Sequence, residues 1–469
     1  MIWRPGHDRI ASMLLIVVLI IFVGVSYHHH LMFKRNLNLS ADLAIHYQSL
    51  LSTLEGRLLI NHIEGVWIGS DSISYLGSHV SLVHLIYLPV LAVLRSPDVL
   101  VMGNLLLITM IAMMTRQAKG YGFGRLESVC VCCILLYHPY LMQQAYLFHP
   151  ELLVVPLQVL MIHSFSINRM RSVWVCSILI LLCREEMALY VILWSLFFLI
   201  NVKKYRIHGI LMITVSLLMF VVDLRVVLPH FAGNAVHAWR YQYLIDGVSL
   251  DDIMKINWRA AARFFLFLSV PFMLIFLRSA KWAIIAIGAP LHLLLSSSVS
   301  DFSTSRHYSI VSLVPMTMGY LHCLSKLNRR RRRSIIGAGL FAIVSLNLVD
   351  SDSLIQHGRV KLNPLLENWM SQQYHPQYEQ LMELLAHEKS IISLSTNLIP
   401  FASNNTHVYP FPNHVEQAEL IVFDPRPISS FYPYTRKEAY DAIIPMQYDS
   451  RYELIPPFGE IIVLRVRSN

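Results

Sequence analysis

Three short polar segments carry the side chains that could do chemistry in an otherwise apolar chain. They are Ser40-Ala41-Asp42-Leu43-Ala44-Ile45-His46-Tyr47-Gln48, Phe148-His149-Pro150-Glu151 and Arg184-Glu185-Glu186. Carboxylates can accept protons, and histidines can bind metals or hydrogen-bond to a substrate. The same residues could instead have structural roles. The helices and loops that would position them help to decide between a chemical and a structural role.

Asp42 illustrates the choice. Leu43, Tyr47 and Leu50 follow it at helical spacing, and Gly56 suits the position just after a helix ends. Aspartate is a preferred N-cap, so the pattern predicts a helix that Asp42 caps. Glu151 has a comparable alternative, because an acid in a first turn is stabilised by the helix dipole.

Composition places the whole chain in a membrane. Of its 469 residues, 55% are hydrophobic and only 14% are charged, which excludes an ordinary soluble protein. About eleven apolar segments could span a bilayer, starting near Ile10, Val99, Leu126, Leu152, Ser172, Met187, Gly209, Ala260, Trp282, Ser309 and Ser334.

Basic residues alternate between these segments and so predict the orientation. They include Arg4, Lys203, Lys204 and the run 329–333, which we place in the cytoplasm by the positive-inside rule. Eleven spans then put the N-terminus inside and the tail outside. The alternation requires that 82–94 does not cross, and its 13 residues reach only about 20 Å.

The chain therefore divides into two predicted domains. Residues 1–350 form the transmembrane domain, in which residues 27–97 make one large first outer loop. A cleaved signal peptide is the alternative to a retained first helix, although no clear cleavage site follows. Residues 351–469 hold 13 acidic and 9 basic residues, and they predict a small extracytoplasmic α/β domain with strands at 390–394, 420–423 and 461–466 and a helix at 377–387.

Polar chemistry is expected at the outer face. In this topology nearly all acids of the membrane half fall in outer segments, and acids contribute little to orientation. The chain has no Walker A, G-x-G-x-x-G, H-E-x-x-H or G-x-S-x-G sequence, so nucleotide-driven pumping and common soluble hydrolase chemistry lack support. His28 to His30 are interpreted as interfacial polar residues, and the six cysteines predict no disulfide framework.

The order of these segments resembles an uncharacterised family of predicted bacterial and archaeal polytopic membrane proteins, itself similar to GT-C-type glycosyltransferases. The first segment resembles the family's F-D-x-G-x-x-D-Q signature, and the other matching segments are Gly77-Ser78-His79-Val80-Ser81, Phe148-His149-Pro150-Glu151, Arg184-Glu185-Glu186, Arg240-Tyr241, Leu294-Leu295-Ser296-Ser297, His307-Tyr308-Ser309 and Val408-Tyr409-Pro410-Phe411-Pro412-Asn413. The chain departs from the pattern at Ala44, Tyr47, Leu82 and Arg184. A mechanism that needs two carboxylates in the first helix is therefore in doubt.

The resemblance implies a GT-C-like membrane glycosyltransferase that moves a hexosyl or pentosyl group from a polyprenyl-phosphate donor to an acceptor at the outer face. Asp42 would be the general base that deprotonates the acceptor hydroxyl. Arg184, Arg240 and Arg306 would bind phosphate, because guanidinium matches phosphate oxygens in a bidentate way. The remaining candidate substrate-binding residues are Gln48, His79, His149, Glu151, Glu185, Glu186, Tyr241 and His307.

The implied partners are the lipid bilayer of the inner membrane, the lipid-linked donor and an acceptor of unknown class, with no nucleic acid. No cofactor is required by the pattern, although a divalent metal could take part. Two other classes stay open from the residues alone. Buried Arg, Glu and His side chains also mark transport paths, so a transporter or lipid-handling protein is one alternative. A non-catalytic assembly factor or sensor is the other.

Overall fold

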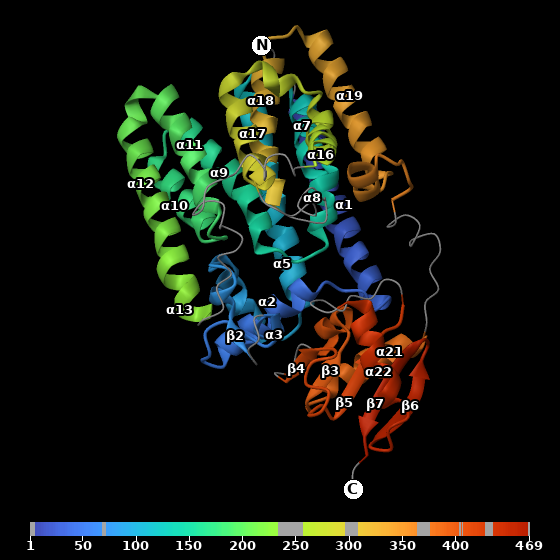
Figure 1. Ribbon diagram of the computed structural model, residues 1–469. Helices are drawn as coiled ribbons and strands as arrows, with labels where there is room; N and C mark the ends of the chain where they lie inside the picture. The colour runs from blue at the N-terminus through green and yellow to red at the C-terminus, as the bar shows by residue number, and fades with distance from the viewer. Residues whose placement is uncertain are drawn as a thin grey trace.

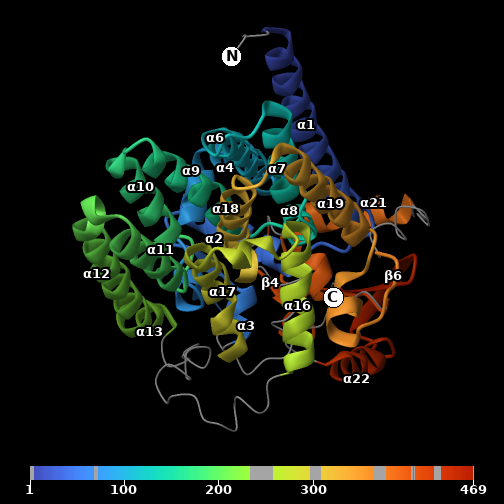
Figure 2. The same ribbon diagram turned by 90° about the horizontal axis from the view of Figure 1, so that it is seen from above.

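The computed structural model is a helical bundle with a small sheet beyond one of its ends (Figure 1). It describes residues 5–67, 72–232, 257–295, 308–363, 376–402, 405, 407–426 and 435–467. Arg240, Tyr241, Arg306 and His307 lie outside the described residues. The start of α1 lies at the end of the bundle away from the sheet, and a view from above shows α10, α11 and α12 on one side of the bundle and α1 and α19 on the other (Figure 2).

Each of the eleven apolar segments predicted from sequence begins inside a helical element. The helices of the bundle are α1 (Pro5–Arg35), α5 (Asp98–Ile108), α6 (Met114–Gly120), α7 (Arg125–Leu136), α8 (Pro139–Ala145), α9 (Val154–Ser166), α10 (Met170–Leu181), α11 (Met187–Asn201), α12 (Arg206–Val222), α13 (Leu228–Ala232), α16 (Trp258–Ser269), α17 (Ala280–Leu295), α18 (Leu313–Leu324) and α19 (Arg329–Asn347). Short 3-10 segments join several of them, among them η3 (Thr109–Met113), η4 (Pro150–Leu153) and η11 (Tyr308–Ser312).

Among the described residues, three helical stretches are long and apolar enough to cross a membrane: 9–35, 98–120 and 203–232. The bent pair α7 and α8, which meet at 60°, would make a fourth if the two form one span. Five further apolar helical stretches are shorter than a bilayer requires. The chain is thus a membrane protein by its helices, and the count of eleven spans stays a prediction.

An ion-pair cluster joins α7 to α19 at the end of the bundle nearer the N-terminus. The Glu127 carboxylate accepts hydrogen bonds from Arg332 at 2.7 Å and from Arg333 at 3.1 Å. Both arginines belong to the basic run that the sequence places in the cytoplasm. The run therefore does more than anchor a helix to lipid, because it also holds α19 against α7.

The first outer loop folds against the opposite end of the bundle, where Figure 1 shows α2, α3 and β2 beside the tail. Its elements are α2 (Ala41–Leu54), β1 (Ile60–Asn61), α3 (Ile63–Trp67), β2 (Ile73–Ser74), η1 (Tyr75–Gly77), η2 (Val83–Tyr87) and α4 (Leu88–Val93). The segment 82–94 is divided between η2 and α4. Neither piece is long enough to cross a bilayer.

The tail forms a five-stranded sheet in the order β4-β3-β5-β7-β6. Its elements are α21 (Pro376–His387), β3 (Ile392–Leu394), η13 (Thr396–Ala402), β4 (Val408–Pro410), β5 (Leu420–Phe423), α22 (Arg436–Met446), β6 (Tyr452–Phe458) and β7 (Ile461–Val466). The β4, β3 and β5 strands are parallel, and β7 and β6 add to β5 in antiparallel fashion. Three of these strands and α21 agree with the sequence prediction, whereas β4, β6 and α22 were not predicted.

The tail is joined to the start of the first outer loop by buried polar contacts. The Asn397 side-chain amide donates to the Leu37 carbonyl at 2.8 Å, and the Arg426 guanidinium donates to the Asn36 carbonyl at 2.9 Å. Tail residues such as Leu398 belong to the same continuous apolar core as the loop and the bundle. The division of the chain at residue 350 stays a prediction. These contacts define an interface between the tail and the first outer loop, which substitutions can test.

Candidate active site

The helix α2 carries Asp42, but Asp42 does not cap it. The N-cap is Ser40, whose Oγ accepts a hydrogen bond from the Asp42 backbone N–H at 3.2 Å. The capping interpretation of Asp42 was therefore wrong by two residues, because serine at Ser40 serves the cap equally well. Asp42 lies in the first turn, with its side chain 48% exposed. Gly56 follows the C-cap Glu55 with φ +85°, as predicted for the position after the helix.

Arg184 is the centre of a buried charged cluster. Its side chain is 2% exposed, and it sits in the turn between α10 and α11. One guanidinium nitrogen lies 3.4 Å from the Glu151 carboxylate, and another lies 3.2 Å from Nε2 of His79. The carboxylates of Glu185 and Glu186 lie within 3.8 Å of the guanidinium. A buried charge is tolerated only when it is paired in this way.

The first outer loop is fastened to this turn by Glu185. Its carboxylate accepts hydrogen bonds from the Val80 backbone N–H at 2.9 Å and pairs with Nδ1 of His79 at 3.1 Å. Two further backbone bonds run from Leu82 and Val83 to the Leu182 carbonyl. The loop thus closes over the buried end of the bundle, and three segments that are remote in sequence meet at one place.

His149, two residues before Glu151, lies beside Asp42. Its Nε2 lies 3.9 Å from Oδ2 of Asp42, while its backbone carbonyl accepts a hydrogen bond from the Asn104 amide at 3.3 Å. Asn104 in turn accepts from the Tyr87 hydroxyl at 3.2 Å. The backbone of His149 is therefore held by Asn104, while the Asp42 carboxylate beside the His149 ring stays accessible to solvent.

Glu151 and Asp42 differ in their environments. Burial raises the pKa of Glu151 to about 7, even though Arg184 favours its ionised form. A buried carboxyl group that titrates near neutral pH, next to a half-exposed one, is typical of sites that move protons. Asp42, which is open to solvent, is the more accessible of the two.

A group of buried aromatic and histidine rings around His46 was not predicted from the sequence. The His46 ring lies one helical turn after Asp42 and contacts the rings of Tyr75, His84 and Phe148, with centroids 4.8 to 5.4 Å apart. Burial lowers the pKa of His84 to about 3 and the pKa of His46 well below its ordinary value. Both are therefore neutral at physiological pH. The spacing of four residues between Asp42 and His46 was the available signal.

The structure brings together Asp42, His79, His149, Glu151, Arg184, Glu185 and Glu186. Gln48 lies elsewhere: it is buried, and its amide donates to the Asn405 carbonyl in the tail at 3.3 Å. The four candidates at 240, 241, 306 and 307 fall outside the described residues. Within the described part of the chain, no group of three or more His, Cys, Asp or Glu side chains is arranged to hold a metal. The guanidinium at the centre of the cluster would also repel a cation.

The fold resembles that of GT-C membrane glycosyltransferases. The structure of ArnT from Cupriavidus metallidurans bound to undecaprenyl phosphate matches with a TM-score of 0.57 at 10% identity, over 97% of both chains. The apo structure of the same protein matches with a TM-score of 0.53 at 11% identity, again over 97% of both chains. The arabinofuranosyltransferase AftD from Mycobacteria gives 0.47 at 14% identity, covering 96% of this chain and 40% of that one.

The family follows from sequence. The chain belongs to the family of predicted membrane proteins described as DUF2079, whose model matches residues 35–441. The matched region includes most of the first outer loop, the bundle after α1 and, in the tail sheet, the strands β3, β4 and β5. No curated protein matches the chain.

Proposed function

We propose that the protein is a membrane glycosyltransferase that moves a sugar from a polyprenyl-phosphate donor to an acceptor at the outer face of the membrane. The observation that carries the proposal is the half-exposed Asp42 carboxylate beside His149, at the edge of the buried Arg184 cluster. The GT-C-like fold supports it, as does the undecaprenyl phosphate bound by ArnT.

In this reaction Asp42 acts as the general base. Its carboxylate takes the proton from the acceptor hydroxyl while that oxygen bonds to the anomeric carbon of the sugar. The bond between the anomeric carbon and the phosphate oxygen breaks, and its electron pair leaves with the lipid phosphate. A positioned base of this kind contributes roughly 10²- to 10⁴-fold in rate. His149, 3.9 Å from Asp42, orients the carboxylate.

Arg184 has a positioning role in this proposal. Its guanidinium already faces the carboxylates of Glu151, Glu185 and Glu186, so it holds the outer loop on the bundle through Glu185 and His79. In this proposal Arg184 does not bind the phosphate, as the family resemblance had suggested. Arg240 and Arg306 stay the candidate phosphate ligands. Stabilising the departing phosphate requires at least one such cation or a set of hydrogen-bond donors.

The test uses the purified full-length protein in lipid vesicles with a radiolabelled polyprenyl-phosphate sugar. Transfer of label to a water-soluble or lipid acceptor added outside the vesicles supports the proposal. Flux of the labelled lipid or its sugar across the membrane without transfer would instead identify a transporter or lipid-handling protein. A protein that does neither with any donor offered would overturn the enzymatic assignment.

A further inference from the structure

The segment of the first outer loop formed by η2 and α4 has one buried face and one exposed apolar face. Val83, Tyr87 and Leu91 are buried at helical spacing, and α4 contacts both α2 and α5. The exposed fractions of the apolar residues on the other face are 47% for Ile86, 48% for Val90, 79% for Val93 and 56% for Leu94. A short helix with two apolar faces belongs at the boundary between the protein and a second apolar phase.

Both ends of this segment are fixed at the outer ends of helices. At its start, the backbone N–H groups of Leu82 and Val83 donate to the carbonyl of Leu182, the C-cap of α10. At its end, residues 94–97 lead directly into Asp98, the first residue of α5. In the predicted topology both of these helix ends lie on the outer side of the membrane. The segment therefore runs along the outer boundary of the bilayer and does not enter its centre.

The α5 helix fixes the depth of the segment. Asp98 begins a stretch of 23 residues that is long and apolar enough to cross a membrane. At a rise of ~1.5 Å per residue this stretch is about as long as a hydrocarbon core of ~30 Å is thick. The α1 helix ends at the same level, because Nε2 of His30 lies 2.9 Å from the Asp98 carboxylate. The exposed side chain of Val93 is therefore expected near the level where acyl chains meet head groups.

Basic residues lie at the end of the exposed apolar face. Lys34 and Arg35 are in the last turn of α1, and Lys34 pairs with Asp98. Arg95 is exposed, and within the described part of the chain its guanidinium has no ion-pair partner. Three cations thus share one carboxylate beside the exposed Val93. A net positive charge next to an apolar face complements a lipid that carries an anionic head group, and guanidinium matches phosphate oxygens in a bidentate way.

We propose that residues 83–95 form a docking surface for the outer leaflet of the membrane, on which Arg95 binds the phosphate of an acidic phospholipid. The side chains of Val90 and Val93 enter the upper part of the acyl chains. Because Leu182 lies two residues before Arg184, this contact also fixes the level of the buried Arg184 cluster relative to the membrane. The proposal does not depend on the transfer reaction.

A fluorescent label at Val93 tests the contact with lipid. The full-length Val93→Cys variant is labelled with the fluorophore NBD and placed in vesicles of phosphatidylcholine and phosphatidylglycerol. Lipids that carry a nitroxide near the top of an acyl chain should quench the label, because nitroxides act only at short range. The parent protein, labelled in the same way, gives the background from the six native cysteines. A label at Val93 that is not quenched would overturn the proposal.

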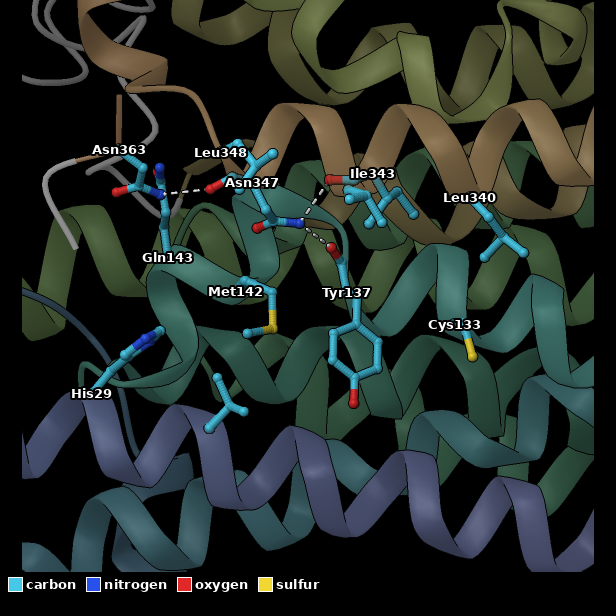
Figure 3. Close-up of a pocket in the computed structure, with 12 residues that line it drawn as sticks. His29, Cys133, Tyr137, Met142, Gln143, Leu340, Ile343, Asn347, Leu348 and Asn363 are labelled. Atoms are coloured by element: carbon cyan, nitrogen blue, oxygen red, sulfur yellow. Dashed lines mark hydrogen bonds between the residues drawn. The ribbon is translucent and has the colours of Figure 1, made fainter. Parts of the chain in front are cut away.

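Two control positions frame this measurement. Leu454→Cys places the label at a residue that is 58% exposed on β6 of the tail, where no quenching is expected. Val344→Cys places it at a residue that is 62% exposed on α19, at an apolar cavity of about 480 Å³ whose walls come from α1, α7, α8 and α19 (Figure 3). None of the twelve residues that line this cavity is Lys or Arg. A label at Val344 should therefore be quenched without a preference for acidic lipid.

The choice of lipid is tested by moving the nitroxide. It is placed first on phosphatidylglycerol and then on phosphatidylcholine, at the same mole fraction. The label at Val93 should be quenched more strongly by the phosphatidylglycerol, and added salt should reduce the difference, because salt screens the attraction. Equal quenching by the two lipids at Val93 would overturn the acidic phospholipid as the occupant.

A second substitution in the Val93→Cys variant assigns the charge. Arg95→Gln should lower the local enrichment of phosphatidylglycerol over phosphatidylcholine roughly fivefold, which is the effect of one cation near a membrane surface. Arg57→Gln is the matched control, because Arg57 is an exposed arginine of the same loop that pairs with Glu55. It should leave the enrichment near the parent level. An enrichment that Arg95→Gln does not change would contradict the assignment of Arg95.

Discussion

The Nε2 atom of His149 lies 3.9 Å from Oδ2 of Asp42, and the two residues are more than 100 positions apart in the chain. The contact joins the first turn of α2 in the outer loop to the residue that precedes η4 in the bundle. It places the accessible carboxylate of the proposed base at the edge of the buried ionic cluster. The first prediction tests whether that placement serves catalysis.

Asp42→Asn should abolish most transfer without unfolding the protein. Asparagine accepts no proton at neutral pH, so the rate should fall by roughly two orders of magnitude or more. The helix cap is untouched, because Ser40 supplies it. Thr435→Ala is the control: it removes the N-cap of α22 in the tail, so it should cost about 1 kcal/mol of stability and keep most activity. Transfer rates and melting temperatures of both variants, measured side by side, would refute Asp42 as the base if Asp42→Asn stays active.

Arg184→Gln should be strongly destabilising. Removing the guanidinium leaves the buried carboxylates of Glu185 and Glu186 without their counter-charge, which typically costs about 3–5 kcal/mol. Arg57→Gln breaks an exposed pair with Glu55 and should cost only about 0.2–1 kcal/mol. Unfolding followed by intrinsic fluorescence in detergent measures both changes. Similar losses in the two variants would mean that the cluster is not structural.

The protein should lose stability as the pH falls below about 6.5. The folded-state pKa of His84 is about 3, and that of His46 is well below 6.5, both because of burial. The unfolded chain therefore binds protons on these histidines that the folded state cannot. Each contributes a loss of about 1.4 kcal/mol for every pH unit below 6.5, until the folded pKa is reached. Glu151 acts in the opposite direction, because burial raises its folded-state pKa to about 7, and it offsets about one of the two losses until the pH approaches its ordinary value. Melting temperatures at pH 7.5 and pH 5 check the trend.

A His84→Gln variant should make that pH dependence less steep, because one of the two titrating groups is removed. The comparison is made on the slope of melting temperature against pH, so a uniform loss of stability does not obscure it. A slope equal to the parent's would assign the acid sensitivity to other groups.

Arg426→Ala should loosen the tail from the first outer loop. The guanidinium bonds both to the Asn36 carbonyl and to the buried Asp424 carboxylate, and charged hydrogen bonds of this kind are worth about 1.5–3 kcal/mol. Arg451→Ala removes an arginine from an exposed pair in the same tail and should have little effect. Limited proteolysis should release a tail fragment faster from the first variant only. Equal rates would contradict the interface.

Reporter fusions test the orientation. A phosphatase that needs disulfides to fold should be active when fused after Asn469 and inactive after Lys204, because disulfides form outside the cytoplasm. The opposite pattern would turn Asp42 towards the cytoplasm and remove the basis for a reaction at the outer face.

The sequence predicted helix positions well because apolar runs are local signals. It also predicted β3, β5 and β7; β5 is a continuous apolar strand buried in the sheet, and β7 begins with four apolar residues. The two strands it missed lie at the edges: β4 has three residues and ends in Pro410, and β6 contains two prolines. Within sheets proline is largely confined to such edge positions, and it interrupts the run of apolar residues by which a strand is recognised in a sequence.

The candidate site could be predicted only as separate pieces. The acids and histidines of the outer segments were identified by type, and six of them, namely Asp42, His79, His149, Glu151, Glu185 and Glu186, lie together with Arg184. That Glu185 would bond to Val80 could not be predicted, since the contact joins segments 105 residues apart. Gln48 was assigned to the site from the family resemblance of its segment, but its direction towards Asn405 depends on the fold of the tail.

The bond from Arg426 to Asn36 spans 390 residues of chain. During synthesis the first outer loop is made well before its partner in the tail, which follows 390 residues later. The segment that leads into α2 therefore lacks this support until the tail has been made. A chain that stops short of Arg426 would lack this bond, and the segment before α2 would then be held only by α1 and by the contacts of the loop with the bundle.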